Sequence, residues 1–178
     1  MERKSFAAMN CSVAQCLEVV GEWWSVLLIR DALLGVTKFD DFWRRLGISK
    51  NILASRLNHL IDRGVMYKSQ YSTKPERYEY LLTEKGRDLW TVITAMREWG
   101  DRYEAPNGPP VEVEHRSCGH ISTMIPVCSH CGERLEWREL KMVPGPGATE
   151  VDLLPKDLFP NSHDDGTTKA GRSDRRVV

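Results

Sequence analysis

The sequence predicts a mainly α-helical fold with one small β hairpin (class α+β), followed by a small β appendage. Three observations carry this prediction. Apolar residues recur at helical spacing through residues 1–105, two short alternating segments lie between residues 65 and 82, and cysteines gather beyond a Pro/Gly-rich break at 105–110. With 178 residues, 41% of them hydrophobic, the chain is long enough to bury a core.

Three helices are expected before residue 47. Ser12 is predicted to cap the first, which ends at Gly21. The second, at about 22–34, is apolar almost all round and is therefore predicted to lie at the centre of the fold. The third spans 39–46 and ends at Gly47.

A fourth helix is expected between the N-cap Ser49 and Gly64. Its apolar residues recur at helical spacing, and the opposite face is polar. Two strands follow, 65–69 and 77–82, joined by a polar loop at 70–76. Two helices joined by the short Gly47-Ile48 link and followed by a basic hairpin have the order of a winged helix-turn-helix domain.

A long helix is predicted to begin at residues 83–86 and to carry an apolar stripe from Leu89 to Tyr103. This stripe is wider than one hairpin can cover. We expect it to form a homodimer interface together with the first helix, with Trp90 and Trp99 taking part. The alternative is that the stripe packs only inside its own subunit.

The formal net charge of zero conceals a charge gradient along the chain. Residues 38–87 hold eleven Lys/Arg and six Asp/Glu, a local charge of +5, whereas residues 106–150 hold four basic and six acidic residues, a charge of −2. Local charge decides where a polyanion docks, so the first window is the candidate DNA-binding surface.

The fourth helix and the hairpin carry the residue types that DNA recognition requires. A helix that enters the major groove presents short polar or cationic side chains near its N-terminal end, and hairpin cations contact phosphate. The expected DNA-binding residues are Ser49, Lys50, Asn51, Ser55, Arg56, His59, Lys68, Lys74 and Arg77. The alternative is a merely solvated helix face, and Arg56 has the further alternative of an ion pair with Asp62.

An ordered set of motifs over about residues 9–103 resembles the HxlR-type transcriptional regulators. The resemblance implies a winged-helix protein that dimerises through its N- and C-terminal helices and binds double-stranded promoter DNA. The expected role is that of a repressor that responds to a small molecule or an oxidant. The motifs are Cys11-Ser12-Val13, Val20-Gly21-Glu22-Trp23-Trp24, Lys38-Phe39-Asp40-Asp41-Phe42, Gly47-Ile48-Ser49, Asp62-Arg63-Gly64-Val65, Arg77-Tyr78-Glu79-Tyr80 and Leu82-Thr83-Glu84-Lys85-Gly86.

The resemblance also draws attention to Cys11, because family members commonly carry a cysteine there that in some of them senses oxidants or electrophiles. The N-terminal end of a helix stabilises negative charge, which favours a reactive thiolate. The alternative role is a half-buried cysteine at the dimer interface. Cys16, on the apolar face of the same helix, is expected in the core.

Residues 106–146 carry a possible metal site. Cys128-Ser-His-Cys131-Gly has the spacing of half a zinc knuckle, and Cys118-Gly-His120 is the nearest second pair. With strands at 111–116, 121–127 and 133–141, these residues predict a zinc-ribbon-like appendage that holds one structural zinc. His115 and His130 are substitutes for the fourth ligand, His120. A metal-free ribbon and a redox dithiol are the alternatives.

Several classes of protein are excluded or disfavoured. No Ser/His/Asp set, P-loop, glycine fingerprint or HExxH motif is present, so the chain is not expected to be an enzyme. No apolar run approaches the roughly 18 residues of a membrane span, and a cytoplasmic protein is expected. Residues 147–178 are expected to be a disordered tail. The alternative to a DNA-binding regulator is a winged-helix protein-interaction module with the ribbon as an adaptor.

Overall fold

The computed structural model describes residues 5–149, which fall into two compact units: one up to Ile125 and a second from Pro126 onward. The first predicted domain ends earlier, at residue 105. The division falls later because a short hairpin after residue 110 belongs to the first unit. Most of the predicted tail, residues 150–178, lies outside the described residues.

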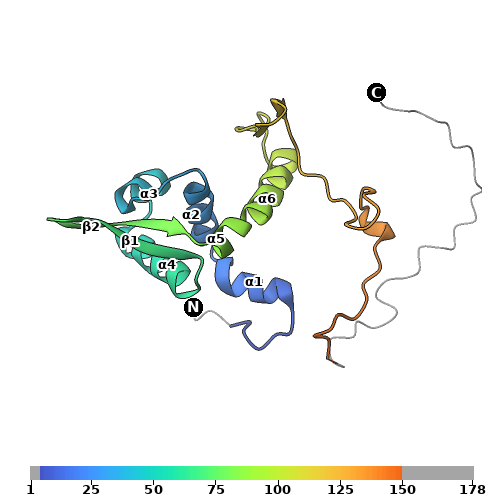
Figure 1. Cartoon of the computed structure of the whole chain (residues 1–178), viewed down its shortest axis with the longest axis horizontal. Helices are drawn as coiled ribbons and strands as arrows, with labels where there is room; N and C mark the ends of the chain where they lie inside the picture. The colour runs from blue at the N-terminus through green and yellow to red at the C-terminus, as the bar shows by residue number, and fades with distance from the viewer. Residues whose placement is uncertain (1–4, 150–178) are drawn as a thin grey trace, which may run out of the picture. The chain divides into compact units, whose positions relative to one another are not determined.

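The first unit combines helices with two antiparallel hairpins, which confirms the predicted mixed class with its small sheet (Figure 1). In the second unit, the described residues contain one short 3-10 helix, η1 (Trp137–Glu139). The elements of the first unit are α1 (Ser12–Val20), α2 (Trp23–Leu33), α3 (Phe39–Leu46), α4 (Lys50–Asp62), β1 (Met66–Thr73), β2 (Glu76–Leu82), α5 (Glu84–Asp88), α6 (Trp90–Tyr103), β3 (Glu114–His115) and β4 (His120–Ile121).

Local capping sets the boundaries of α3 and α4. Gly47 takes the left-handed conformation, with φ 65°, and its N–H donates to the Trp43 carbonyl at 3.0 Å, which ends α3. The Ser49 hydroxyl accepts from the Ile52 N–H at 3.3 Å and caps α4. At α1 the prediction was wrong by one residue: Cys11 is the N-cap, and Ser12 is the first helical residue.

The β1–β2 hairpin, called the wing below, is longer than predicted. The expected polar loop at 70–76 is wrong, because β1 runs to Thr73 and β2 begins at Glu76, leaving only Lys74-Pro75 between them. The register runs from Met66 opposite Leu82 to Thr73 opposite Glu76, with an irregularity between Gln70 and Ser72. Cross-strand hydrogen bonds extend the strands through residues that are polar in sequence.

The long C-terminal helix is broken at Leu89 into α5 and α6. The Thr83 hydroxyl caps α5 by accepting from the Gly86 N–H at 3.1 Å. Gly86 is buried against the backbone of Val65, the residue just before β1. A Cβ on Gly86 would lie 2.1 Å from the Val65 carbonyl oxygen. Only glycine allows this close approach.

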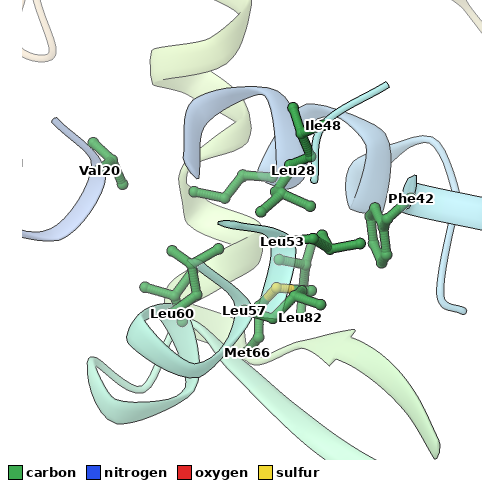
Figure 2. Packing of buried hydrophobic residues seen from close by; sticks show 11 residues of the cluster. Val20, Leu28, Phe42, Ile48, Leu53, Leu57, Leu60, Met66 and Leu82 are labelled. Atoms are coloured by element: carbon green, nitrogen blue, oxygen red, sulfur yellow. The ribbon is translucent and has the colours of Figure 1, made fainter. Parts of the chain in front are cut away.

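The core lies between α2, α3, α4 and the base of the wing (Figure 2). Leu28 and Ile29 of α2 are fully buried, which confirms the central position predicted for that helix. Among the described residues, no single helix is long and apolar enough to span a membrane; α1 and α2 pass such a test only as a pair bent by 78°. The remaining buried apolar residues are Ala14, Val20, Phe42, Ile48, Leu53, Leu57, Leu60, Val65, Met66 and Leu82.

Residues 111–149 contain much less regular structure than predicted. The strands expected at 111–116 and 121–127 shrink to the two-residue β3 and β4, and a single bridge pairs Val127 with Arg134. The third expected strand, 133–141, is wrong, because η1 lies within it. None of the residues 111–149 is buried, so these short segments have no apolar core to extend them.

Candidate nucleic-acid interface

The N-terminal half of α4 presents a polar surface because its other face is anchored in the core. Leu53 and Leu57 are fully buried, and the preceding Ile48 is buried as well. Periodicity then turns Lys50, Asn51 and Ser55 to the exposed side. This is the arrangement that a helix needs to reach base edges in a major groove.

Two further predicted DNA-binding residues of α4 make contacts inside the protein. The Arg56 guanidinium lies 3.4 Å from the Glu22 carboxylate, and its side chain is 29% exposed. The partner is Glu22 rather than Asp62. His59 places Nε2 3.0 Å from the Val19 carbonyl oxygen. DNA contact by these two residues stays a prediction, and the structure gives them a role in holding α4 against α1 and α2.

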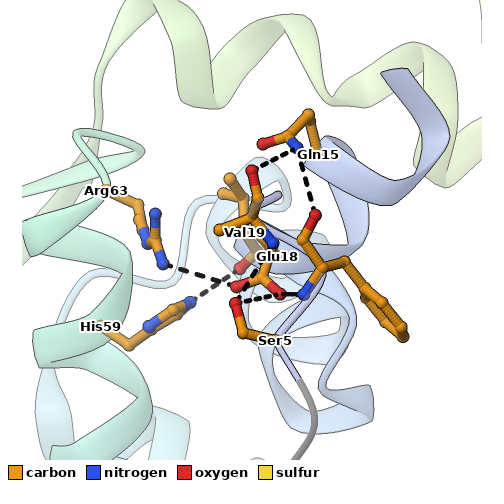
Figure 3. Close-up of polar contacts among 8 residues, drawn as sticks. Ser5, Gln15, Glu18, Val19, His59 and Arg63 are labelled. Carbon is orange, nitrogen blue, oxygen red and sulfur yellow. Dashed lines mark hydrogen bonds and ion pairs between the residues drawn. The ribbon is translucent and has the colours of Figure 1, made fainter. Parts of the chain in front are cut away.

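A buried carboxylate extends this connection (Figure 3). Glu18 of α1, 9% exposed, accepts hydrogen bonds from the Ser5 hydroxyl at 3.3 Å and from the Phe6 N–H. Its other oxygen lies 3.7 Å from the Arg63 guanidinium, just after α4. The N-terminal segment, α1 and the C-terminal end of α4 are thus tied together by polar contacts.

The wing supplies the cations expected to meet phosphate. Lys74 and Arg77 are exposed at its tip, and neither forms an ion pair with any of residues 5–149. Lys68 lies farther along β1, with Nζ 3.7 Å from the centroid of the Tyr78 ring. Lys74 and Arg77 can therefore contact the phosphates of a DNA backbone without first breaking an ion pair with a carboxylate of residues 5–149.

Sequence reasoning missed the aromatic rings that hold the lysines of this surface. Lys50 Nζ lies 4.5 Å from the Trp43 ring centroid, and Lys38 Nζ lies 5.3 Å from that of Tyr71. Such cation–π contacts orient a lysine while leaving its charge available. Trp43 and Tyr71 are visible in the sequence, but spacing along the chain does not show which lysine each ring contacts.

A carboxylate clamp joins α2 to α3. Asp31 is fully buried and lies 2.9 Å from the Arg30 guanidinium and 3.2 Å from that of Arg45. Hydrogen bonding to Asp31, then its charge, raises the pKa of Arg45 above its ordinary value. Arg44 pairs with Asp41. The two arginines of α3 are therefore already engaged within the protein.

The structure places the two N-terminal cysteines differently. Cys11 is exposed at the N-cap of α1, and Cys16 is part-buried against the core, as expected. All five cysteines are free thiols.

The predicted metal ligands lie in two separate turns. Cys118 and His120 belong to the β3–β4 hairpin of the first unit, where Cys118 Sγ lies 3.4 Å from His115 Nδ1 and the Cys118 carbonyl oxygen lies 2.8 Å from His120 Nδ1. Within residues 5–149, no group of three or more His, Cys, Asp or Glu is arranged to hold a metal. The zinc ribbon stays a prediction.

Cys128 and Cys131 belong to a turn in the second unit. Hydrogen bonds from the backbone of Cys131 and His130 lower the pKa of the Cys128 thiol below its ordinary value. A thiolate at this position is therefore stabilised by the local backbone.

Comparison with known proteins finds one matching family and several similar proteins. The HxlR-like helix-turn-helix family matches residues 19–107. Rv3095, an uncharacterized HTH-type transcriptional regulator of Mycobacterium tuberculosis, is 44% identical over 137 residues, which are 76% of this chain and 87% of the relative. The structure of PA1607, a candidate transcription factor, has a TM-score of 0.72 and 36% identity, and the match covers 80% of this chain and 100% of that one. The redox regulator HypR in its oxidized form has a TM-score of 0.50 and 32% identity over 53% of this chain and 98% of its own.

Proposed function

Because the chain belongs to the HxlR-like helix-turn-helix family and is a DNA-binding transcriptional regulator, we propose that it works as a homodimer whose α4 helices read base edges while its wings grip phosphate. One observation carries this proposal. The polar face of the N-terminal half of α4 is exposed, and the wing cations Lys74 and Arg77 form no ion pair with a carboxylate within residues 5–149. The relatives are named as HTH-type transcriptional regulators.

The readout is assigned to Lys50, Asn51 and Ser55. The Asn51 amide can bond an adenine edge in two places, Lys50 can donate to guanine, and Ser55 adapts to either kind of base. A good bidentate contact contributes about 1–3 kcal/mol of discrimination between bases. Lys74 and Arg77 add affinity without sequence preference, because phosphate is the same at every step.

The dimer is assigned to α6 and α1. Within the part of the chain that the structure describes, no residue of α6 is buried, and Trp99 and Tyr103 are 59% and 60% exposed. Their rings contact one another at 5.4 Å between centroids. Val13 of α1 is 68% exposed. So many exposed large apolar side chains indicate a surface that packs against a partner. A second copy of the chain also supplies the second recognition helix that a palindromic site requires.

Regulation through Cys11 is the remaining part of the proposal. The exposed thiol lies at the N-cap of α1, and α1 is tied to α4 by the Glu18–Arg63 and Val19–His59 contacts. The similarity to the redox regulator HypR supports an oxidant as the signal. Oxidation at Cys11 would move α1 and so alter the spacing of the two α4 helices. A Cys11→Ser variant whose DNA binding still responds to oxidant would refute this assignment.

The readout is tested by selecting duplexes from a random library with the full chain and measuring their affinity against a scrambled duplex. Asn51→Ala should lose about tenfold or more of the preference for the selected sequence while keeping its affinity for the scrambled one. Asn107→Ala removes the same amide outside α4 and should change neither affinity. Preference retained in Asn51→Ala would contradict the assignment, and no DNA binding by the wild type would overturn the whole proposal.

A further inference from the structure

Trp43 and Lys50 face one another across the turn of the helix-turn-helix. Trp43 lies on α3 next to the fully buried Phe42, and its own side chain is 39% exposed. The left-handed Gly47 and the buried Ile48 fix the path of the chain from α3 into α4. This path brings Lys50 Nζ to 4.5 Å from the centroid of the Trp43 ring.

Lys50 lies at an unfavourable position for a cation. It is the first residue of α4, where the unpaired N–H groups carry partial positive charge, and the first turn contains no acidic residue to offset it. Lys50 also forms no ion pair with a carboxylate of residues 5–149. The group that the described residues place against this ammonium is the face of the Trp43 indole, which attracts a cation.

The cations of the DNA-binding surface are therefore of two kinds. Lys74 and Arg77, at the tip of the wing, have neither an ion pair nor an aromatic contact within the described part of the chain. Flexible side chains suit contact with phosphate, which is the same at every step. Lys50 instead is held by a ring at the start of α4, where contact with a base edge requires a defined direction.

We propose that Trp43 is a positioning residue for base readout, and that it directs the Lys50 ammonium toward the O6 and N7 acceptors of a guanine. The ring restricts side-chain freedom that Lys50 would otherwise lose on binding, so it strengthens the one contact that depends on direction. Each half-site of the operator should therefore carry a guanine whose recognition requires both residues. This inference rests on the proposed readout by α4.

The size of the effect follows from the strength of the ring contact. An exposed cation–π contact corresponds to about a two- to fivefold change in an equilibrium constant. Removing the Trp43 ring should lower the preference for guanine at that position by about this factor. Removing the Lys50 ammonium should lower it by about tenfold or more, because the hydrogen bonds to the base are lost as well.

The test selects duplexes from a random library with the full-length wild type and each variant, and compares the base preference at every position of the selected sites. Lys50→Ala identifies the position that Lys50 reads. Trp43→Leu should relax that same position by about two- to fivefold and leave the other positions and the salt dependence unchanged. Trp43→Gln, a second variant without a ring, should do the same.

Two further variants serve as controls. Trp43→Phe keeps an aromatic face and should keep most of the preference for guanine. Trp137→Leu removes an indole in the second unit, which has its own contact with Arg138, and should relax no position. Far-ultraviolet circular dichroism checks that the helices of every variant remain folded.

Three results for the ringless variants would overturn the proposal. Relaxation at no position would show that Lys50 reads its base without help from the ring. Relaxation at a position other than the one identified by Lys50→Ala would make Trp43 a direct DNA contact. Equal loss at all positions would give Trp43 a structural role only.

The same selection separates failure of this inference from failure of the proposed function. If Lys50→Ala relaxes no position, the inference fails, because Trp43 then has no readout to support. If Asn51→Ala relaxes none either, the proposed readout by α4 fails with it.

Discussion

Removing the two tip cations of the wing should make DNA binding less dependent on salt. Lys74 and Arg77 are exposed and form no ion pair with any other residue in the range 5–149, so the Lys74→Ala/Arg77→Ala double variant disturbs no internal pairing there. Each cation that neutralises a phosphate releases bound counterions, and the logarithm of the affinity then falls with the logarithm of the salt concentration.

The magnitude follows from counting contacts. Two cations per chain make four in a homodimer, and each phosphate contact contributes about 0.9 to the slope, so the double variant should flatten the slope by about 3.6. A protein that binds as a monomer would flatten it by only about 1.8. The same experiment therefore reports both the role of the wing and the number of wings engaged.

The assay is fluorescence anisotropy with a mixed-sequence duplex at salt concentrations from about 50 to 200 mM. The charge-preserving variant Lys74→Arg/Arg77→Lys is the control and should keep the wild-type slope. An unchanged slope in the alanine variant would refute phosphate contact by the wing. So would an equal flattening in the charge-preserving variant, because that would indicate a damaged hairpin.

Three further outcomes are expected. Gly86→Ala should lower the free energy of unfolding by about 1–3 kcal/mol in urea titrations, because its Cβ would lie 2.1 Å from the Val65 carbonyl oxygen. Gly100→Ala, whose Cβ would meet nothing within 4 Å, should not lower it. Burial raises the pKa of Tyr80, so the folded protein holds the phenol proton more tightly than the unfolded chain does. This contribution to stability is complete below the unfolded-state pKa and is lost as pH rises through the folded-state pKa. Tyr80→Phe should therefore resist denaturation above about pH 10 better than the wild type. Met96→Asp on α6, where the side chain is 53% exposed, should shift the protein to monomer in light-scattering measurements, and a dimer of unchanged stability would contradict the α6 interface.

The helix-turn-helix could be predicted because its signals are local. Gly47 readily takes the left-handed backbone conformation that ends α3, and the Ser49 hydroxyl accepts from an amide three residues away at the start of α4. Both residues therefore act on their immediate neighbours. Apolar periodicity then decides which face of α4 is buried and which presents Lys50 and Asn51. Charge in the 38–87 window pointed to the same surface.

The wing was predicted only in part. Alternation identified its two strands, but polar residues between 70 and 76 read as a loop, although cross-strand hydrogen bonds hold most of them in the hairpin. The residues that those hydrogen bonds join depend on the register between β1 and β2. The break at Leu89 was likewise invisible, because an apolar stripe runs past it without interruption.

By itself, the sequence determined the class of fold, the helix-turn-helix, the cationic hairpin and the presence of two cysteine-bearing turns, because each depends on residues close together in the chain. The tertiary structure decided the partners. His59 meets a carbonyl 40 residues away, Arg56 pairs with Glu22 rather than Asp62, and the lysines meet aromatic rings on neighbouring elements. It also placed His115 Nδ1 3.4 Å from the Cys118 thiol. Spacing along a chain gives the types of side chain available, but only the folded backbone sets the directions in which they point, and direction selects one partner among chemically equivalent candidates.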